Sequence, residues 1–151
     1  MASIDKDWFQ IKACHRDVIR SLVACGAHLQ LGSLELGEEL CYLARLGFKK
    51  KISCFKLAGA NLNSINFSKQ TALHASVETG QLKVVQYLLE NNIEINKRDV
   101  YGKTALDIAK ELERIEIANL IERHLNLCQK WQDVAKLAVL KPLSNGASKT
   151  S

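Results

Sequence analysis

The amino-acid sequence predicts an all-α fold, a solenoid of about four helix-turn-helix units of which the first is degenerate. The first observation behind this prediction is that the triplet Thr-Ala-Leu at 71–73 recurs at 104–106. The second is that apolar residues follow each triplet at the three- and four-residue spacing of a helix. Such short helix pairs cannot bury their apolar sides alone, so neighbouring pairs are expected to stack and cover one another.

We call the step from position 71 to position 104 the repeat period. It extends back toward the N-terminus, where Gly59-Ala60 falls on Gly26-Ala27. A register that holds over three intervals without an insertion indicates four units rather than a chance match. The other pairs in register are Leu40 with Leu73, Gly47 with Gly80, Ile52 with Val85, Phe55 with Leu88, and Asn63 with Asn96.

The third unit shows the elements of each pair most clearly. Thr71 is expected to open a helix that runs to Thr79, because a threonine oxygen accepts hydrogen bonds from the free N–H groups of a helix start. Gly80 ends this helix, since glycine takes the left-handed conformation at little cost. A second helix is predicted over 81–91. Its apolar side consists of Leu82, Val85, Leu88 and Leu89.

Beyond the repeats, the sequence predicts a different organisation. We divide the chain into a repeat domain over 1–125, a C-terminal capping helix over 126–141 and a disordered tail over 142–151. The capping helix is expected to cover the open end of the stack, and a partner-binding amphipathic helix is the alternative. The proline that follows Lys141 is expected to end it. Its apolar side consists of Leu127, Trp131, Val134 and Ala138.

The composition is typical of a soluble globular protein, with 47% hydrophobic and 25% charged residues. No apolar run reaches the ~18 residues of a membrane span, and no secretory signal is visible at the start. The five cysteines are scattered without a C-x-x-C pair, which is typical of reduced thiols in a cytoplasmic protein. We therefore expect a cytoplasmic monomer without a membrane span.

The sequence offers little chemistry of its own. The net charge is +5, and the run Lys49–Lys51 favours a solvated helix face over nucleic-acid or anionic-lipid binding, because interleaved stacking aromatics are lacking. Motifs of the G-x-S-x-G, G-x-x-x-x-G-K and H-E-x-x-H types are absent. Cys14 and His15 are adjacent, so on a helix they point in different directions. The sequence therefore predicts a chain that is not an enzyme, with no cofactor and no metal site.

The two later units resemble the ankyrin repeat. Its pattern is D-x-x-G-x-T-P-L-H-x-A and then G-H-x-x-x-V-x-x-L-L-x-x-G-A-x-x-N, matched here by NFSKQTALHASVETGQLKVVQYLLENNIEIN and DVYGKTALDIA. LAGANLN and CGAHLQ supply the Gly-Ala ends of the earlier units, so the resemblance covers about 8–124. More narrowly, the chain resembles the C-terminal ankyrin region of animal lysophospholipase/L-asparaginase-like proteins, without the catalytic domain.

Some positions depart from the ankyrin pattern. Ala72 and Ala105 replace the proline at the first helical position. Lys69 replaces the loop-tip glycine, so the turn of the third unit is expected to be distorted. Glu113 replaces the glycine between the two helices of the last unit, so this pair is expected to fuse or to bend differently.

The resemblance also assigns structural roles. The threonine and histidine of T-x-L-H join a hydrogen-bond network that pins loop to helix in ankyrin repeats. His74 is therefore expected to be structural rather than an acid–base catalyst or a metal ligand. The positions expected to be structural are Thr71, Leu73, His74, Gly80, Val85, Leu88, Thr104 and Leu106.

The resemblance implies a non-enzymatic module that binds another protein through a concave face built from loop tips and inner helices. The alternative is an accessory or regulatory region of an asparaginase/lysophospholipase-type enzyme. Phe67 and Tyr101 on adjacent tips are the expected anchors, since aromatics dominate binding hot spots, and an inward-packed Phe67 is the alternative. The predicted contact residues are Phe67, Ser68, Gln70, Glu78, Thr79, Val100, Tyr101, Lys103, Glu111 and Leu112.

Overall fold

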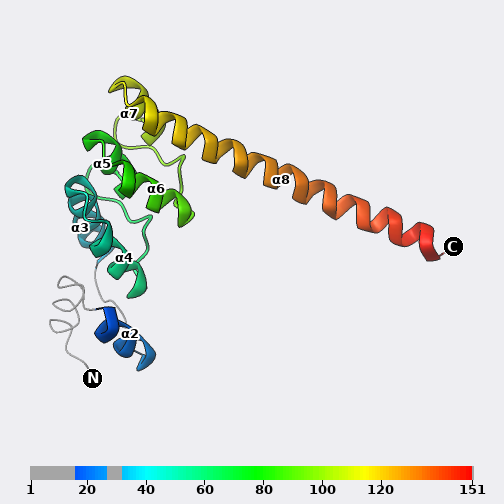
Figure 1. Ribbon diagram of the computed structural model, residues 1–151, viewed down its shortest axis with the longest axis horizontal. Coiled ribbons are helices and arrows are strands. Elements are labelled where there is room, and N and C mark those ends of the chain that lie inside the picture. Colours follow the sequence, from blue (N-terminus) through cyan, green and yellow to red (C-terminus); the bar gives the residue numbers. More distant parts are fainter. Residues whose placement is uncertain (1–15, 27–31, 151) are drawn as a thin grey trace.

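A computed structural model describes residues 16–26 and 32–150, in which every regular element is a helix (Figure 1). The predicted all-α fold is confirmed. The elements in chain order are α2 (Arg16–Ala24), α3 (Ser33–Leu46), α4 (Lys49–Leu57), α5 (Ala72–Thr79), α6 (Leu82–Glu90), α7 (Ala105–Glu111) and α8 (Ile115–Thr150).

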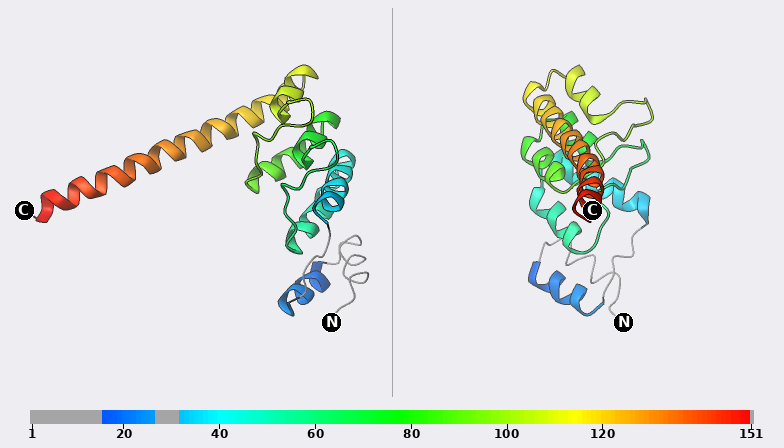
Figure 2. Two further views of the ribbon diagram at one scale, coloured as in Figure 1. Left: turned by 180° about the vertical axis from the view of Figure 1, so that it is seen from behind. Right: turned by 90° about the vertical axis from the view of Figure 1, so that its right-hand side faces the viewer.

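The helices form two layers of a solenoid. The inner helices α3, α5 and α7 stack in a row, and α4, α6 and the start of α8 form the outer row beside them (Figure 1). The long loops over 58–71 and 91–104 emerge on one side of the stack (Figure 2). The helices of the third unit lie within one residue of the predicted bounds.

The core repeats with the same period as the sequence. Phe55, Leu88 and Ile121 occupy equivalent positions of successive units, in α4, α6 and α8, and all three are fully buried. Leu73 and Val85 of the third unit are buried as well. Each unit therefore places one large side chain at the same depth between the two rows, as stacking requires.

Left-handed backbone conformations follow the repeat period too. Three positions of the repeat adopt this conformation: the end of the outer helix, the turn between the two helices and the loop tip. They do so whether the residue is glycine or not. The three sets are Gly26, Gly59 and Asn92; Gly47, Gly80 and Glu113; and Lys69 and Gly102.

Lys69 and Glu113 therefore take the conformation of the glycines they replace, with φ of 55° and 54°. The Lys69 amide donates to Asn66 O at 3.0 Å, as the Gly102 amide donates to Asp99 O at 3.0 Å. The predictions of a distorted turn and a fused helix pair are wrong, because packing against neighbouring units fixes the backbone against the local preference.

We expect Glu113→Gly to stabilise the protein by about 0.5–1 kcal/mol. A left-handed non-glycine residue costs roughly 1–2 kcal/mol, and the entropy of an added glycine offsets part of that gain. Urea denaturation followed by circular dichroism measures the difference. Glu116→Gly is the control, because Glu116 is an exposed glutamate in the first turn of α8, where glycine costs about 1 kcal/mol. A loss of stability in both variants would contradict the expectation.

The second unit has no loop tip. α3 has 14 residues against 8 in α5, and its extra N-terminal turns take the place of the tip seen in later units. This extension approaches the next loop closely at Gly37, where an added Cβ would lie 2.0 Å from the Ile65 carbonyl oxygen. The Phe67 amide also donates to Glu38 Oε1 at 3.2 Å.

The C-terminal helix differs from the predicted division. α8 is at once the outer helix of the fourth unit and the whole C-terminal region, and it runs without a break to Thr150 (Figure 1). Residues 126–138 are exposed and cover no part of the stack, because no glycine or proline between His124 and Lys141 allows the chain to turn back. Pro142 removes one helical hydrogen bond, which makes the last turns the least favourable part of this helix.

Two further observations bear on the environment of the chain. Cys54 is buried and disulfide-bonded, so the prediction of reduced thiols is wrong for this residue. Disulfide pairing depends on which cysteines meet in space, which their spacing in the sequence does not reveal. Within the described ranges, no helix is both long enough and apolar enough to span a bilayer.

Candidate protein-binding face

Two neighbouring loop tips, 67–70 and 100–103, are built in the same way. Asn66 Oδ1 accepts hydrogen bonds from the Ser68 and Gln70 amides at 2.9 Å each. Asp99 Oδ1 accepts from the Tyr101 and Lys103 amides, also at 2.9 Å. These buried side chains add to the backbone hydrogen bonds within each tip and hold it in one shape.

The two tips are also joined to each other. The Val100 amide donates to the Ser68 carbonyl at 3.1 Å. Phe67 and Tyr101 point outward from this joined pair, with exposed fractions of 75% and 80%. The alternative of an inward-packed Phe67 is therefore not observed. Val100 is half-exposed beside them.

Four of the predicted contact residues are paired with one another. In the third unit, Gln70 Nε2 donates to Glu78 Oε1 at 2.5 Å. At the equivalent positions of the fourth unit, Lys103 Nζ lies 2.7 Å from Glu111 Oε2. Arg45 of α3 adds a hydrogen bond to Gln70 Oε1 at 2.8 Å and an ion pair with Glu78 at 3.5 Å. Two polar groups, Arg45–Gln70–Glu78 and Lys103–Glu111, therefore lie on the inner helices next to the tips, and together we call them the polar ridge.

Gln70 is a correction to the predicted contacts. It is only 8% exposed, and its amide is occupied by Arg45 and Glu78. It supports the face from beneath, because the long Arg45 side chain of the preceding unit reaches over it. Ser68, Thr79 and Leu112 are exposed members of the set, and Lys103 is half-buried. We call the exposed members of the set and the polar ridge the tip face.

His74 lies beneath the tip face and joins the two units. Its Nδ1 accepts from the Thr71 amide at 3.1 Å and lies 2.9 Å from the Thr71 hydroxyl. Because Nδ1 accepts a hydrogen bond, the ring is neutral with its proton on Nε2, which donates to the Lys103 carbonyl at 3.2 Å. Burial lowers the pKa of His74 below its usual 6.5, so the neutral ring is the stable form.

The next unit performs the same capping with an acid. Asp107 stands at the position of His74, and its Oδ2 accepts from the Thr104 amide at 2.9 Å. The Asp107 amide in turn donates to Thr104 Oγ1 at 3.2 Å. These hydrogen bonds lower the pKa of the Asp107 carboxyl. Thr71 and Thr104 therefore each close the first turn of an inner helix in a capping box. The partner side chain is the His74 ring in α5 and the Asp107 carboxylate in α7.

The lowered pKa of His74 makes stability depend on pH. Below about pH 6.5 the unfolded chain binds a proton that the folded chain excludes. The contribution of His74 to stability should therefore be complete above pH 6.5 and fall as pH drops toward the lowered folded pKa, by at most about 1.4 kcal/mol per pH unit.

Urea unfolding between about pH 7.5 and pH 5 measures this loss. His74→Gln retains an acceptor and a donor but cannot titrate, so its stability should change less over this interval. The difference between the two chains removes the contribution of all other groups. Equal slopes would contradict a buried neutral His74.

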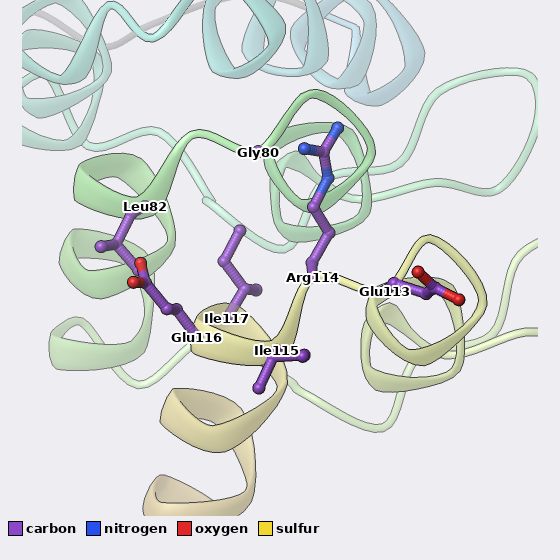
Figure 3. A pocket seen from close by; sticks show the side chains of 7 residues that line it. All are labelled: Gly80, Leu82, Glu113, Arg114, Ile115, Glu116 and Ile117. Carbon is purple, nitrogen blue, oxygen red and sulfur yellow. The ribbon is translucent and has the colours of Figure 1, made fainter.

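A shallow recess of about 320 Å³ lies at the opposite ends of α5 and α7, between the helix–helix turns (Figure 3). Arg114 crosses it toward Gly80, and its Nη2 donates to Glu78 O at 3.2 Å. Gln81 makes the same contact one unit earlier, to Arg45 O at 3.0 Å. Each residue caps the inner helix of the preceding unit. The recess is lined by Gly80, Leu82, Glu113, Arg114, Ile115, Glu116 and Ile117.

The described residues show no set of three His, Cys, Asp or Glu side chains placed to hold a metal ion. Cys41, at the position of His74 one unit earlier, is a buried thiol that donates to Gln70 O at 3.4 Å. Burial raises the pKa of Cys41 to about 12, which keeps the sulfur protonated and unreactive.

The sequence interpretation missed four residues that shape the face and its supports. Asn66 and Asp99 stand one repeat period apart, and this spacing was a signal that would have found them. Arg45 and Arg114 carried no such signal, because the residues one repeat period away are Glu78 and Gln81, so the residue type does not repeat.

Comparisons with known proteins agree with the geometry of the chain. A family model described as ankyrin repeats (3 copies) matches residues 40–130. An L-asparaginase of Dirofilaria immitis is 33% identical over 102 residues, which are 68% of this chain and 17% of that protein. The potassium channel AKT1 of Arabidopsis thaliana is 28% identical over 92 residues, which are 61% of this chain and 11% of the channel.

A third relative, alpha-latrotoxin-Lh1a of Latrodectus hasselti, is 36% identical over 62 residues, or 41% of this chain and 5% of the toxin. The chain therefore spans less than a fifth of the length of each of these relatives. What they share with it is the repeat region rather than a whole protein. By the matched family model and by its stacked helix pairs, the chain belongs to the ankyrin-repeat family.

Proposed function

We propose that the chain binds another protein through the tip face. The observation that carries this proposal is the exposure of Phe67 and Tyr101 on two tips that hydrogen bonds join and shape. Aromatic side chains on a preformed backbone lose little conformational freedom on binding, and they are frequent hot spots. Ankyrin repeats in general are protein-interaction modules.

The polar ridge suggests how a partner would be oriented. Glu78 and Glu111 each keep a half-buried or exposed carboxylate on the inner helices, beside Arg45 and Lys103. A partner with both a cationic and an anionic group next to an apolar anchor would match this pattern. Exposed ion pairs contribute little affinity but favour one orientation of the partner over others.

Affinity capture with three immobilised chains tests the proposal. We expect the wild type and Gln86→Ala to retain the same partner, and the double variant Phe67→Ala/Tyr101→Ala to lose most of it. Truncation of a hot-spot residue costs about 2 kcal/mol or more, about a 30-fold loss of affinity. Gln86 is the control because it is exposed on the outer helix α6. Equal retention by all three folded chains would refute the tip face.

A second candidate function follows from the similarity to the nematode L-asparaginase, of which the match covers 17%. The chain would then act as an accessory or regulatory region of an enzyme of the asparaginase/lysophospholipase type. An in-frame amidohydrolase coding region upstream of Met1 in the transcript would support this candidate. A transcript with a stop codon directly before Met1 would refute it.

We also propose that the described part of the chain carries no catalysis of its own and works in the cytoplasm. Its buried Cys41 and His74 are held by structural hydrogen bonds. The location in the cytoplasm is supported by three free thiols, those of Cys25, Cys41 and Cys128. The disulfide bond of Cys54 is the observation that speaks against it, because disulfides persist in oxidising compartments. Imaging of the tagged full-length protein decides the location.

A further inference from the structure

The turns between the two helices of each unit form an edge of the stack opposite the loop tips. This edge consists of the ends of the inner helices α3, α5 and α7 and of the starts of the outer helices α4, α6 and α8. The Cα–Cβ bonds of a helix tilt toward its N-terminus, so the side chains in the first turns of the outer helices lean toward this edge. We call the surface formed by residues 46–51, 80–83 and 113–116 the turn edge.

Exposed apolar side chains gather on the turn edge. Leu82 and Ile115 occupy equivalent positions of the third and fourth units, at the rim of the recess (Figure 3). Leu46 and Phe48 belong to the second unit. All four are more than a third exposed, and Ile115 is exposed by 69%. Three successive units therefore each present a large apolar side chain to solvent along the same edge, which is typical of an interaction surface.

Lysines stand among these apolar side chains. Lys49–Lys51 form the first turn of α4, and Lys83 lies in the first turn of α6 at the position equivalent to Lys50. Neither of these first turns contains an acid. Glu113 and Glu116 lie at the far end of the edge, so the positive charge is concentrated in the second and third units. The turn edge therefore combines positive charge with exposed apolar groups.

We propose that the turn edge binds the surface of an anionic lipid bilayer. The two surfaces are complementary, because lysines attract anionic headgroups while apolar side chains beside them enter the headgroup region. The shape of the chain permits the approach. The loop tips lie at the other ends of the inner helices, and α8 begins at the turn edge and runs away from it (Figure 1). An extended flat surface can therefore reach the edge without meeting the loop tips or α8.

Two other kinds of partner fit the turn edge less well. Lys51 Nζ lies over the Phe48 ring, 5.1 Å from its centroid, so a stacked nucleic-acid base would compete with a lysine of the chain itself. A duplex would take the lysines but leave Leu82 and Ile115 against charged phosphates. A protein ligand needs a pocket for its anchor, and the recess here is shallow and crossed by Arg114.

The fold supplies what the run of lysines lacked in the sequence. The run alone favoured a solvated helix face, but stacking of the units places Leu82, Lys83 and Ile115 along the same edge. The proposal does not depend on the tip face, because the two surfaces share no residue. A chain bound to a bilayer by the turn edge would hold its loop tips away from the membrane, where a protein partner can reach them.

Cosedimentation of the full chain with lipid vesicles tests the proposal. Vesicles of phosphatidylcholine alone are compared with vesicles that contain about 30% phosphatidylserine, at about 0.1 M salt. We expect binding to the anionic vesicles only, and release at about 0.5 M salt because exposed charges are then screened. Lys49→Gln/Lys83→Gln should weaken this binding about 30-fold, since each lysine near an anionic surface contributes about fivefold. Ile115→Ser should weaken it about tenfold.

Lys130→Gln/Lys136→Gln is the matched control, because it removes the same charge from the exposed part of α8. This control and Phe67→Ala/Tyr101→Ala should bind anionic vesicles as the wild type does, and circular dichroism verifies that every variant is folded. Absence of binding to anionic vesicles would overturn the proposal, as would an equal loss in the matched control. An oligonucleotide that binds the wild type but not Lys49→Gln/Lys83→Gln, without any vesicle binding, would assign the lysines to nucleic acid instead.

Discussion

Replacing Leu88 by alanine should lower the free energy of unfolding by about 2–5 kcal/mol. Leu88 is fully buried, as are Phe55 one unit earlier and Ile121 one unit later. Truncation at the middle of this series leaves a cavity that neighbouring units can fill only by shifting the stack. Each unit is stable only against its neighbours, so the damage is not confined to the third unit.

Urea denaturation followed by circular dichroism measures the effect of Leu88→Ala. Gln86→Ala, two residues earlier in α6 and exposed, is the control and should change stability by less than about 0.5 kcal/mol. If Leu88→Ala also costs less than about half a kilocalorie, α6 does not present this side chain to the core and the helix register is wrong.

We expect Gly37→Ala to destabilise the protein by about 3 kcal/mol, although glycine-to-alanine changes inside helices normally stabilise by about 1 kcal/mol. The added Cβ would lie 2.0 Å from Ile65 O and 2.9 Å from Asn66 N. Both atoms belong to the backbone of the next loop, so no side-chain rotation relieves the contact. The loop and α3 must separate, which disturbs the base of the first tip.

The matched control is Gly32→Ala, at the start of the same helix. Its added Cβ would meet only the flexible Glu35 side chain, at 3.7 Å, so stability should change by less than about 0.5 kcal/mol. Thermal unfolding of the two variants gives the comparison. A Gly37→Ala protein as stable as the wild type, or more stable, would show that α3 and the 65–66 loop do not approach as described.

Much of the fold could be predicted because its signals are local and repeated. Thr71 and Gly80 mark the ends of α5, and the spacing that leads to Leu88 marks the buried side of α6. These signals recur at the repeat period, so one unit supports the assignment of the next. Helix positions and buried sides are fixed by short-range periodicity, which a sequence displays directly.

The candidate site could be predicted only in part. The tip positions of Phe67 and Tyr101 followed from the resemblance to the ankyrin repeat, but their outward direction depended on how Asn66 and Asp99 fold each loop. Gln70 was expected on the surface, and the Arg45 side chain of the preceding unit places it below. Contacts between units involve long side chains, and no spacing within one unit encodes them.

The sequence by itself determined the number of units, their register and the helices within them. Only the tertiary structure decided that Lys69 and Glu113 take glycine conformations, that Gly37 touches the next loop, and that α8 runs straight off the stack. The physical reason is the relative size of two free energies. The conformational preference of one residue is worth about 1 kcal/mol, and the packing of buried side chains between stacked units contributes more than that. Where packing ends, beyond Leu125, helix continuity alone directs the chain.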